Sequence, residues 1–259
     1  MPDPSWQLPE FDAVELGPKT SAICVLIPVV NEGARLTLQL GRMLDLPFDV
    51  IVADGGSTDG STEPDTLRDL GVRAVLRMKD GPGLSSQLRM GFAWALDEGY
   101  EGIVTIDGNG KDGVEAIPRF AETLRNGFDY VQGSRYVPGG EAINTPPDRH
   151  LAVKLLHAPV LSLAAGQRFT DTTNGFRAFS ARLLRDPRVA PFRDVFHTYN
   201  LHYYLTARAP RLGFRCTEIP VRRAYPERGR TPTKIGGWWG KAKLIGQLLA
   251  AATGRYDPR

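Results

Sequence analysis

The side chains most able to do chemistry follow short apolar runs. Asp54 opens the stretch DGGSTDG, and Asp107 and Asn109 lie in TIDGNGKDG. A carboxylate just after a strand can bind a metal ion or accept hydrogen bonds from the base or ribose of a nucleotide. Arg135 follows a further apolar run, in the triplet GSR. Taken alone, DGGSTDG is also compatible with a simple turn and helix cap.

The elements that must position these residues alternate between strand and helix. Strands are expected at 22–30, 48–56, 72–78, 101–107 and 129–136, with helices between them at 31–44, 60–71, 83–99 and 114–127. This alternation predicts a parallel sheet covered on both faces. Ligands bind such sheets at the carboxyl ends of the strands, which is where the acidic residues fall.

The second half of the chain is less regular. Helical segments are expected at 150–166, 198–209 and 238–252, strands at 175–180 and 214–223, and loops at 137–150 and 225–237. The loop 225–237 is basic and punctuated by Pro and Gly.

Length and charge bound the kind of protein. The chain has 259 residues and a net charge of +3, so bulk charge gives no sign of a nucleic-acid partner. From Arg208 to Arg259 there are 12 Lys and Arg against 3 Asp and Glu, so this tail carries +9 and the rest −6. Such a tail indicates anionic partners, phosphate groups or acidic lipids, or else a solvated basic surface.

The termini and cysteines point to the cytoplasm. Residues 1–20 are Pro-rich and acidic, unlike a signal peptide, and are expected to be a flexible or draped leader. Cys24 and Cys216 have no metal-like spacing and fit free thiols in a reducing compartment. No apolar run reaches the roughly 18 to 20 residues that span a bilayer.

Six motifs occur in order along the chain: PVVNE, ADGGSTDG, TIDGN, GSRYVPGG, DTTNGFR and a late basic TK pair. Together, over about residues 22–236, they resemble family 2 glycosyltransferases, and most of all the dolichol-phosphate mannosyltransferase-like, polyprenyl-phosphate branch. The resemblance implies an α/β fold of the GT-A class, with a Rossmann-like, mostly parallel sheet flanked by helices. The implied division is a leader at 1–20, a GT-A domain at 21–236 with a nucleotide-sugar half at 21–136 and an acceptor half at 137–236, and a C-terminal amphipathic helix and tail at 237–259.

The resemblance also implies an activity. A family member of this branch transfers a hexose, with inversion, from a nucleotide-diphospho-sugar of the GDP-mannose or UDP-glucose type to a polyprenyl phosphate. Transfer to a hydroxyl of a polysaccharide, lipid or small molecule is an alternative, and so is a catalytically silent nucleotide-sugar-binding homologue. A sugar-1-phosphate nucleotidyltransferase is disfavoured, because the Gly-rich, Arg-containing turn of such enzymes reads PVVNEGAR here.

Roles follow from the resemblance residue by residue. The implied catalytic residues are Asp107, Arg135 and His202. The implied nucleotide-sugar-binding residues are Pro28, Asn31, Glu32, Asp54, Gly56, Ser57, Arg89, Asp107, Gly108 and Asn109. The implied phosphate- and acceptor-binding residues are Lys111, Arg135, Arg177, Arg222, Arg230, Thr233 and Lys234. Gly55 stands where a second acid usually follows Asp54, which leaves the selectivity for the base open.

The motif DGN raises the question of a metal. Family members usually bind Mg²⁺ or Mn²⁺ with a D-x-D motif, and Asn109 stands where its second acid would be. Asp107 and the carbonyl oxygen of Asn109 could hold the ion, with Asp112 as a replacement ligand. The alternatives are a degenerate turn in an inactive relative, or positive charge supplied directly by the basic side chains of Lys111, Arg135, Arg230 and Lys234.

Two further features have competing interpretations. His202 stands where the resemblance expects a Glu, and is either structural or an acceptor contact or base, which would suit a hydroxyl acceptor. The segment 238–252 places Trp and Lys beside Leu and Ile, which favours either peripheral contact with the membrane or packing on the core. The expected location is cytoplasmic, peripheral at the inner face of the membrane.

Overall fold

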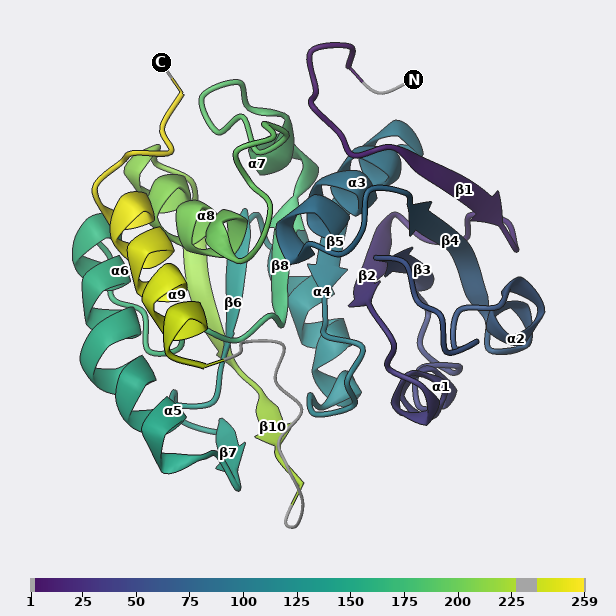
Figure 1. Ribbon diagram of the computed structural model, residues 1–259, viewed down its shortest axis with the longest axis horizontal. Coiled ribbons are helices and arrows are strands. Elements are labelled where there is room, and N and C mark those ends of the chain that lie inside the picture. Colours follow the sequence, from purple (N-terminus) through teal and green to yellow (C-terminus); the bar gives the residue numbers. More distant parts are fainter. Residues whose placement is uncertain (1–2, 227–236, 259) are drawn as a thin grey trace.

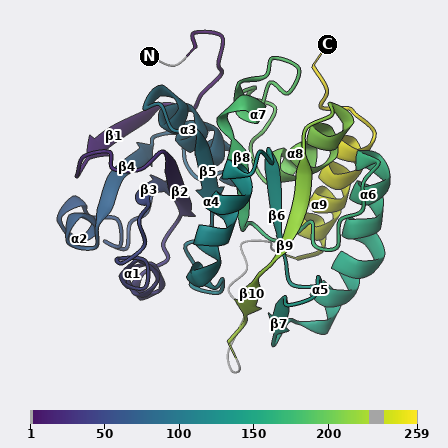
Figure 2. The same ribbon diagram turned by 180° about the vertical axis from the view of Figure 1, so that it is seen from behind.

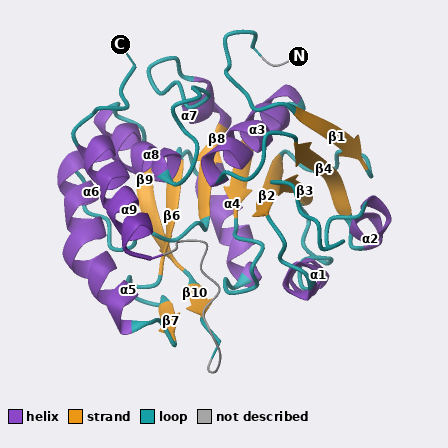
Figure 3. Ribbon diagram, in the orientation of Figure 1, coloured by secondary structure: helices purple, strands orange, loops and turns teal. Residues whose placement is uncertain are grey.

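The computed structural model describes residues 3–226 and 237–258, without the side chains of 237–239 and 241. A mixed sheet runs through its centre in the order β1-β4-β3-β2-β5-β8-β6-β9 (Figures 1 and 3). Its strands are β1 (Phe11–Glu15), β2 (Ile23–Val29), β3 (Asp49–Asp54), β4 (Val72–Met78), β5 (Gly102–Thr105), β6 (Tyr130–Ser134), β8 (Arg177–Ser180) and β9 (Cys216–Pro220).

Most of the sheet is parallel. The ladders β4-β3, β3-β2, β2-β5 and β6-β9 are parallel, whereas β8 is antiparallel to both β5 and β6. A smaller parallel pair, β7 (Glu141–Ile143) and β10 (Arg222–Ala224), lies beyond the sheet, at the end opposite the chain termini in Figure 1. The inserted strand β8 therefore joins two parallel units into one sheet.

Helices cover both faces, because strands buried on both sides present alternate apolar residues to each. One face packs on α3 (Leu84–Asp97), α7 (Ala181–Arg185) and α8 (Asn200–Arg211). The other packs on α1 (Ala34–Gly41), α2 (Pro64–Asp69) and α4 (Ile117–Arg125), which follows the 3₁₀ turn η1 (Val114–Ala116). Helix α3 lies in front of the sheet in Figure 1, and α4 lies in front in the reverse view of Figure 2.

A third group of helices packs beside α8. It consists of α5 (Pro147–Ala152), the π-helical turn η2 (Val153–His157), α6 (Ala158–Ala165) and α9 (Gly237–Ala252). Leu161, Tyr203 and Leu248 share an apolar cluster at their contact. No helix in the described part of the chain is long and apolar enough to cross a membrane.

The predicted α/β class, with a mostly parallel sheet flanked by helices, is confirmed. The five expected strands of the first half are present, as is the helix expected at 238–252. The leader is draped rather than flexible, because Phe11–Glu15 pairs with β4 as an antiparallel edge strand. Strand β7 and helix α7 were not expected, and β7 lies inside the segment predicted as a loop.

Candidate active site

Three neighbouring strands end at one edge of the sheet. In the parallel register, Val29 of β2 lies beside Asp54 of β3, and Leu26 lies beside Thr105 of β5. Asp54 is the last residue of β3, and Asp107 comes two residues after β5. Because β2, β3 and β5 are parallel, the carboxyl ends that the sequence predicted as a ligand edge lie together.

The loop after β3 is ordered by its own carboxylate. Asp54 Oδ1 accepts from the backbone N–H groups of Gly56 and Ser57 at 3.1 and 2.8 Å, and Oδ2 accepts from the Thr62 hydroxyl at 2.8 Å. Asn31 ties this loop to the end of β2, because its Oδ1 accepts from Thr58 N–H at 2.7 Å. Asp54 thus shapes the loop, and its predicted contact with a base remains a prediction.

Arg223 connects two carboxylates at the end of β5. Its Nη2 donates to Asp107 Oδ2 at 3.0 Å, and its Nη1 donates to Asp112 Oδ2 at 2.5 Å. Nη1 also donates to Asn174 Oδ1 at 3.2 Å. The Asp112 side chain is fully buried, whereas that of Asp107 is 25% exposed. A guanidinium between two carboxylates makes charge-assisted bonds of the strong kind, so this cluster is built as one unit.

The charges of this unit follow from burial and pairing. Burial alone raises the pKa of Asp107, but the guanidinium of Arg223 lowers it below its usual value. Burial raises the pKa of Asp112 to about 6, against the opposing effect of Arg223. Both carboxylates are therefore anionic at neutral pH, and Arg223 is cationic.

The backbone fixes this geometry. Ala224 N–H donates to Lys111 O at 2.8 Å, and Gly113 N–H donates to Arg222 O at 3.0 Å, so the loop after β5 pairs with β10. Strand alternation then turns Arg223 inward and Arg222 outward, where Arg222 lies 3.4 Å from Glu141 Oε2. The backbone at Gly175 approaches so closely that a β carbon there would overlap Asp107 Oδ1.

Cations gather around Tyr225, which directly follows β10. Lys111 Nζ and the guanidinium carbons of Arg149 and Arg223 lie 5.3, 5.7 and 5.8 Å from the ring centre. Burial alone would raise the pKa of Tyr225, but the neighbouring guanidiniums, Arg223 foremost, lower it. Burial, with Arg223 nearby, lowers the pKa of the Lys111 ammonium. Asp107 favours the charged form of Lys111, but no carboxylate among the described residues lies within ion-pair distance of its ammonium.

Arg135 is held away from such a role. Its guanidinium donates twice to Asp171, through Nε at 2.6 Å and Nη2 at 2.9 Å, and once to Thr173 Oγ1 at 3.1 Å. Both members of the pair are buried. Arg135 therefore anchors the loop before Gly175, and its predicted direct part in catalysis is not evident from its contacts.

Arg177 is a structural residue in this arrangement. It is fully buried on β8 and donates to Tyr130 Oη, to the carbonyls of His202 and Thr172, and to other interior acceptors at 2.8–3.0 Å. These bonds join β8 to α8 and leave the guanidinium facing protein. Its predicted phosphate contact gains no support from this position.

His202 is close enough to Asp107 to affect its charge. Burial lowers the pKa of the His202 imidazole well below its usual value, and Asp107 only partly opposes this. Its Nε2 atom is buried and finds no hydrogen-bond partner in the described part of the chain, and the same holds for Asp112 Oδ1 and Asn174 Nδ2. Buried polar atoms are usually paired, so these three indicate groups that meet a ligand or water.

The geometry does not fit a divalent ion at Asp107 and Asn109. Lys111 N–H donates to Asn109 Oδ1 at 3.2 Å, so the amide oxygen faces the backbone, and Asn109 Nδ2 faces Asp107 Oδ2 at 3.3 Å. Arg223 occupies one oxygen of each of two carboxylates here, Asp107 Oδ2 and Asp112 Oδ2. Among the residues that the structure describes, no group of three His, Cys, Asp or Glu side chains could hold a metal ion.

Other predicted residues fall elsewhere. Arg89 donates to Gln7 O and faces the leader, away from the strand ends that its neighbour Gln87 contacts. Glu32 pairs with Arg35 at 3.0 Å beside the site, and Pro28 and Gly108 lie at the edge itself. The predicted phosphate-binding residues Arg230, Thr233 and Lys234 lie outside the described residues.

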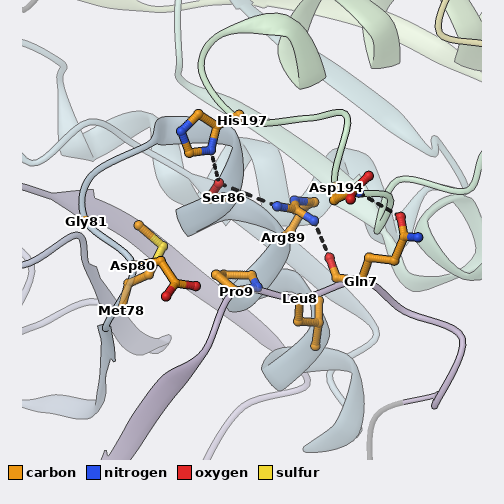
Figure 4. Close-up of a pocket in the computed structure, with 10 residues that line it drawn as sticks. All are labelled: Gln7, Leu8, Pro9, Met78, Asp80, Gly81, Ser86, Arg89, Asp194 and His197. Atoms are coloured by element: carbon orange, nitrogen blue, oxygen red, sulfur yellow. Dashed lines mark hydrogen bonds between the residues drawn. The ribbon is translucent and has the colours of Figure 1, made fainter.

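A cavity of about 330 Å³ lies apart from this cluster, between the leader and the start of α3 (Figure 4). Most of its polar groups contact one another: Arg89 donates to Gln7 O, Ser86 Oγ lies 2.9 Å from His197 Nδ1, and Asp194 N–H donates to Gln7 Oε1 at 2.9 Å, whereas Arg89 Nε has no partner among the described residues. This cavity therefore reflects the docking of the leader rather than a set of unused catalytic groups.

Arg223 is the principal residue that the motifs missed. Its position beside Arg222 on a strand predicts that one arginine points inward, but the local sequence does not say which. The pairing of β10 with β7 and with the loop 111–113 decides it, and that pairing joins segments far apart in the chain. The motifs do not identify Arg149 and Tyr225 for the same reason, since their place in the site also depends on contacts between distant segments.

Comparisons with known proteins agree with this architecture. Residues 24–188 match the family model described as glycosyl transferase family 2. The chain is 34% identical to undecaprenyl-phosphate mannosyltransferase of Micrococcus luteus, covering 89% of this chain and 92% of that protein. It is 30% identical to polyprenol monophosphomannose synthase of Mycolicibacterium smegmatis, covering 84% and 82%. Dolichyl-phosphate hexose transferase of Haloferax volcanii is 28% identical, with 79% and 81% covered.

Proposed function

The chain belongs to glycosyl transferase family 2, and we propose that it transfers a hexose from a nucleotide-diphospho-sugar to a polyprenyl phosphate, with inversion. Membership confirms that the protein is a glycosyltransferase of the implied GT-A class. The observation that carries the proposal is the cationic cluster around Tyr225, which lies beside Asp107 at the ligand edge of the sheet. One of the similar proteins is named for undecaprenyl phosphate and another for polyprenol monophosphomannose, which supports this acceptor class.

The donor would lie across the carboxyl ends of β2, β3 and β5. The loops carrying Asn31 and Ser57 are joined by hydrogen bonds and would hold the nucleoside. The diphosphate would then reach the cations near Asp107. This arrangement supports the predicted division into a donor half at 21–136 and an acceptor half at 137–236, which stays a proposal.

Transfer needs little proton movement with this acceptor. One oxygen of the acceptor phosphate attacks the anomeric carbon, and the bond from that carbon to the diphosphate oxygen breaks. The electron pair of the broken bond stays on the leaving nucleoside diphosphate. Because the acceptor phosphate is already anionic, positioning contributes more than a general base would.

The helix at 147–157 suits a lipid phosphate. Arg149 faces the Tyr225 ring, and Lys154 Nζ lies 5.3 Å from the centre of the Tyr136 ring, so its cations point toward the site. Its Leu151 and Leu155 are 57% and 69% exposed. Cations on one side and exposed leucines on the other would hold a phosphate and its hydrocarbon chain together.

The same reasoning supports peripheral contact with the membrane through α9. Ile245 and Leu249 are four residues apart on one side of this helix and are exposed, whereas Leu248 packs on the core. Lys243 is exposed nearby. We place the protein at the cytoplasmic face of the membrane, where anionic lipids would attract these cations.

The test is transfer of label into lipid. The protein is incubated with a radiolabelled nucleotide-hexose and polyprenyl phosphate, and the lipid extract is counted. Label is expected in the extract with polyprenyl phosphate and absent with the matched polyprenol, which lacks the phosphate. Label that reaches neither lipid, from any nucleotide-hexose, would contradict the proposal.

One observation favours a hydroxyl acceptor as a second candidate. The neutral His202 imidazole is buried near Asp107 with an unpaired Nε2, as a base for a hydroxyl would need to be. In the same assay, label transferred to polyprenol rather than to its phosphate would favour this candidate. Binding of the nucleotide without transfer to any acceptor would instead indicate a silent homologue.

A further inference from the structure

We propose that Arg223 is a built-in cation that takes the place of a divalent ion, so that the donor diphosphate binds without metal. The proposal rests on the proposed function, since it assumes a nucleoside-diphosphate ligand. It goes beyond that function because it names the side chain that binds the diphosphate.

The first argument is the position of the guanidinium. Arg223 lies between Asp107 Oδ2 and Asp112 Oδ2, at 3.0 and 2.5 Å. A divalent ion held by these two carboxylates would need the space that the guanidinium fills. The ion could enter only if Arg223 moved away, and that would leave the buried guanidinium without its two counter-charges, which is costly.

The second argument is the way Arg223 is held. The residue belongs to β10, and its neighbour Ala224 donates to Lys111 O at 2.8 Å. Asn174 Oδ1 fixes the third contact of the guanidinium at 3.2 Å. A side chain pinned by its own strand and by three acceptors is a fixed donor, as preorganised electrostatic stabilisation requires.

The third argument is the number of N–H donors that Arg223 has left for a ligand. A guanidinium has five N–H donors. Asp112, Asn174 and Asp107 accept three bonds from Arg223, two from Nη1 and one from Nη2. The Tyr225 hydroxyl lies near enough to accept a further one. At least one N–H donor then remains for an oxygen of a phosphate.

The fourth argument is the balance of charge. Asp107 and Asp112 contribute two negative charges, and Arg223 and Lys111 contribute two positive charges. Arg149 lies over the same Tyr225 ring and makes the cluster net positive. Asn109, in place of a second acid, removes the negative charge that a divalent ion would otherwise have balanced. When the bond to the anomeric carbon breaks, its electron pair moves onto the diphosphate, where Arg223 and Lys111 stabilise it.

The experiment measures metal and nucleotide binding separately on the whole protein. Mn²⁺ binding is followed by the electron paramagnetic resonance signal of the free ion. Binding of the nucleoside diphosphate that the wild type prefers is followed by calorimetry, with Mg²⁺ and with chelator. For the wild type, we expect no Mn²⁺ binding, and a nucleotide affinity that differs less than about threefold between the two conditions. A loss of tenfold or more in chelator would overturn the proposal without the use of any variant.

The variant Arg223→Gln removes the cation. In chelator, nucleotide affinity is expected to fall about tenfold, the factor that one hydrogen bond to a charged group supplies. Mn²⁺ binding is expected to appear and to restore part of that affinity. The double variant Arg223→Gln with Asp112→Asn also removes the charge of Asp112, so that only Asp107 is left without its counter-charge. It replaces the single variant in the binding experiments if the single variant does not fold.

The matched control is Arg188→Gln, which removes the same charge from an exposed position. Arg188 pairs with Asp186 instead of the cluster, so its variant is expected to leave Mn²⁺ binding undetectable and the affinity in chelator as in the wild type. Equal effects of the two variants would overturn the assignment to Arg223. Metal-independent nucleotide binding without lipid product would contradict the proposed function alone, and lipid product that requires metal would contradict this inference alone.

Discussion

Arg135 and Asp171 form a two-point ion pair inside the protein, with Nε and Nη2 of the arginine 2.6 and 2.9 Å from the two carboxylate oxygens. Although burial alone would raise the pKa of Asp171, its bonds with Arg135 lower it. The pair holds the loop before β8 against the end of β6. Arg135 thus fixes the position of that loop, and its predicted catalytic role stays a prediction.

This pair predicts a large effect on folding. Asp171→Asn should lower the free energy of unfolding by about 3 kcal/mol, because it leaves a buried guanidinium without its counter-charge. Urea denaturation measures the change. Asp65→Asn, which breaks the exposed pair with Arg68, is the control and should change stability little. A loss for Asp171→Asn no larger than the control's would show that the pair is not structural.

Asp107→Asn tests the carboxylate at the centre of the site. The variant keeps the shape of the side chain but removes the charge that holds Arg223. Transfer should fall about a hundredfold or more, the range seen when one preorganised electrostatic contact is lost. Initial rates at saturating donor measure it, with circular dichroism to verify the fold. Wild-type rates in a folded variant would remove Asp107 from the mechanism.

His202 predicts a dependence of stability on pH. Its pKa is lowered well below its usual value of about 6.5 by burial, so the unfolded state binds the proton more readily. The contribution is therefore present above pH 6.5 and is lost as the pH falls below it. Between pH 7.5 and 5.5 the loss should be about 1.4 kcal/mol.

The measurement is urea denaturation at both pH values for the wild type and for His202→Asn. His157 is also buried with a lowered pKa, so the comparison with the variant isolates the part due to His202. The variant should lose less stability on acidification than the wild type. The same loss in both proteins would mean that His202 is not buried as a neutral group.

The close approach of Gly55 to Gln87 predicts that substitutions at these two positions have coupled effects on stability. A β carbon at Gly55 would lie 2.9 Å from Gln87 Cδ and 2.8 Å from Val30 Cγ2. Gln87 Nε2 donates to the carbonyls of Val29 and Ala53 at 2.9 and 2.7 Å, where β2 and β3 end. The glutamine thus fills the space beside Gly55, where the resemblance expects a second acid.

Gly55→Asp should therefore cost about 1–3 kcal/mol of stability through overpacking. In a Gln87→Ala background the same change should cost less, because the clash with Gln87 is gone. A double-mutant cycle in urea gives the coupling between the two sites. Strictly additive losses would contradict the close contact.

The sequence predicted the donor half of the fold well, because its apolar strands and amphipathic helices alternate with clear turn residues. Strand β4 was expected at 72–78 and lies at Val72–Met78. The exceptions depend on distant partners. The edge strand β1 is half-exposed and exists through its pairing with β4, and the short β7 exists through its pairing with β10.

The sequence predicted where the site residues lie in the fold better than it predicted which atoms they contact. Asp107 and the loop of Asp54 lie at the expected edge, since strand ends determine them. Arg177 is predicted as a phosphate ligand, and this stays a prediction; its contacts join β8 to α8, and this burial depends on tertiary packing that no local pattern encodes. The inward turn of Arg223 depends on a bridge to Asp112 across the chain, which no local pattern encodes.

The most direct measurement is thermal unfolding against GDP, UDP, dTDP and CDP in the presence of chelator. The central claim is that Arg223, held by Asp107 and Asp112, binds the diphosphate of a nucleotide sugar together with Lys111. It predicts that one nucleotide stabilises the protein by about 2.7 kcal/mol at a hundredfold its dissociation constant. The Arg223→Gln variant should show a smaller shift with that nucleotide. No stabilisation by any of the four, with chelator or with Mg²⁺ or Mn²⁺, would contradict the claim.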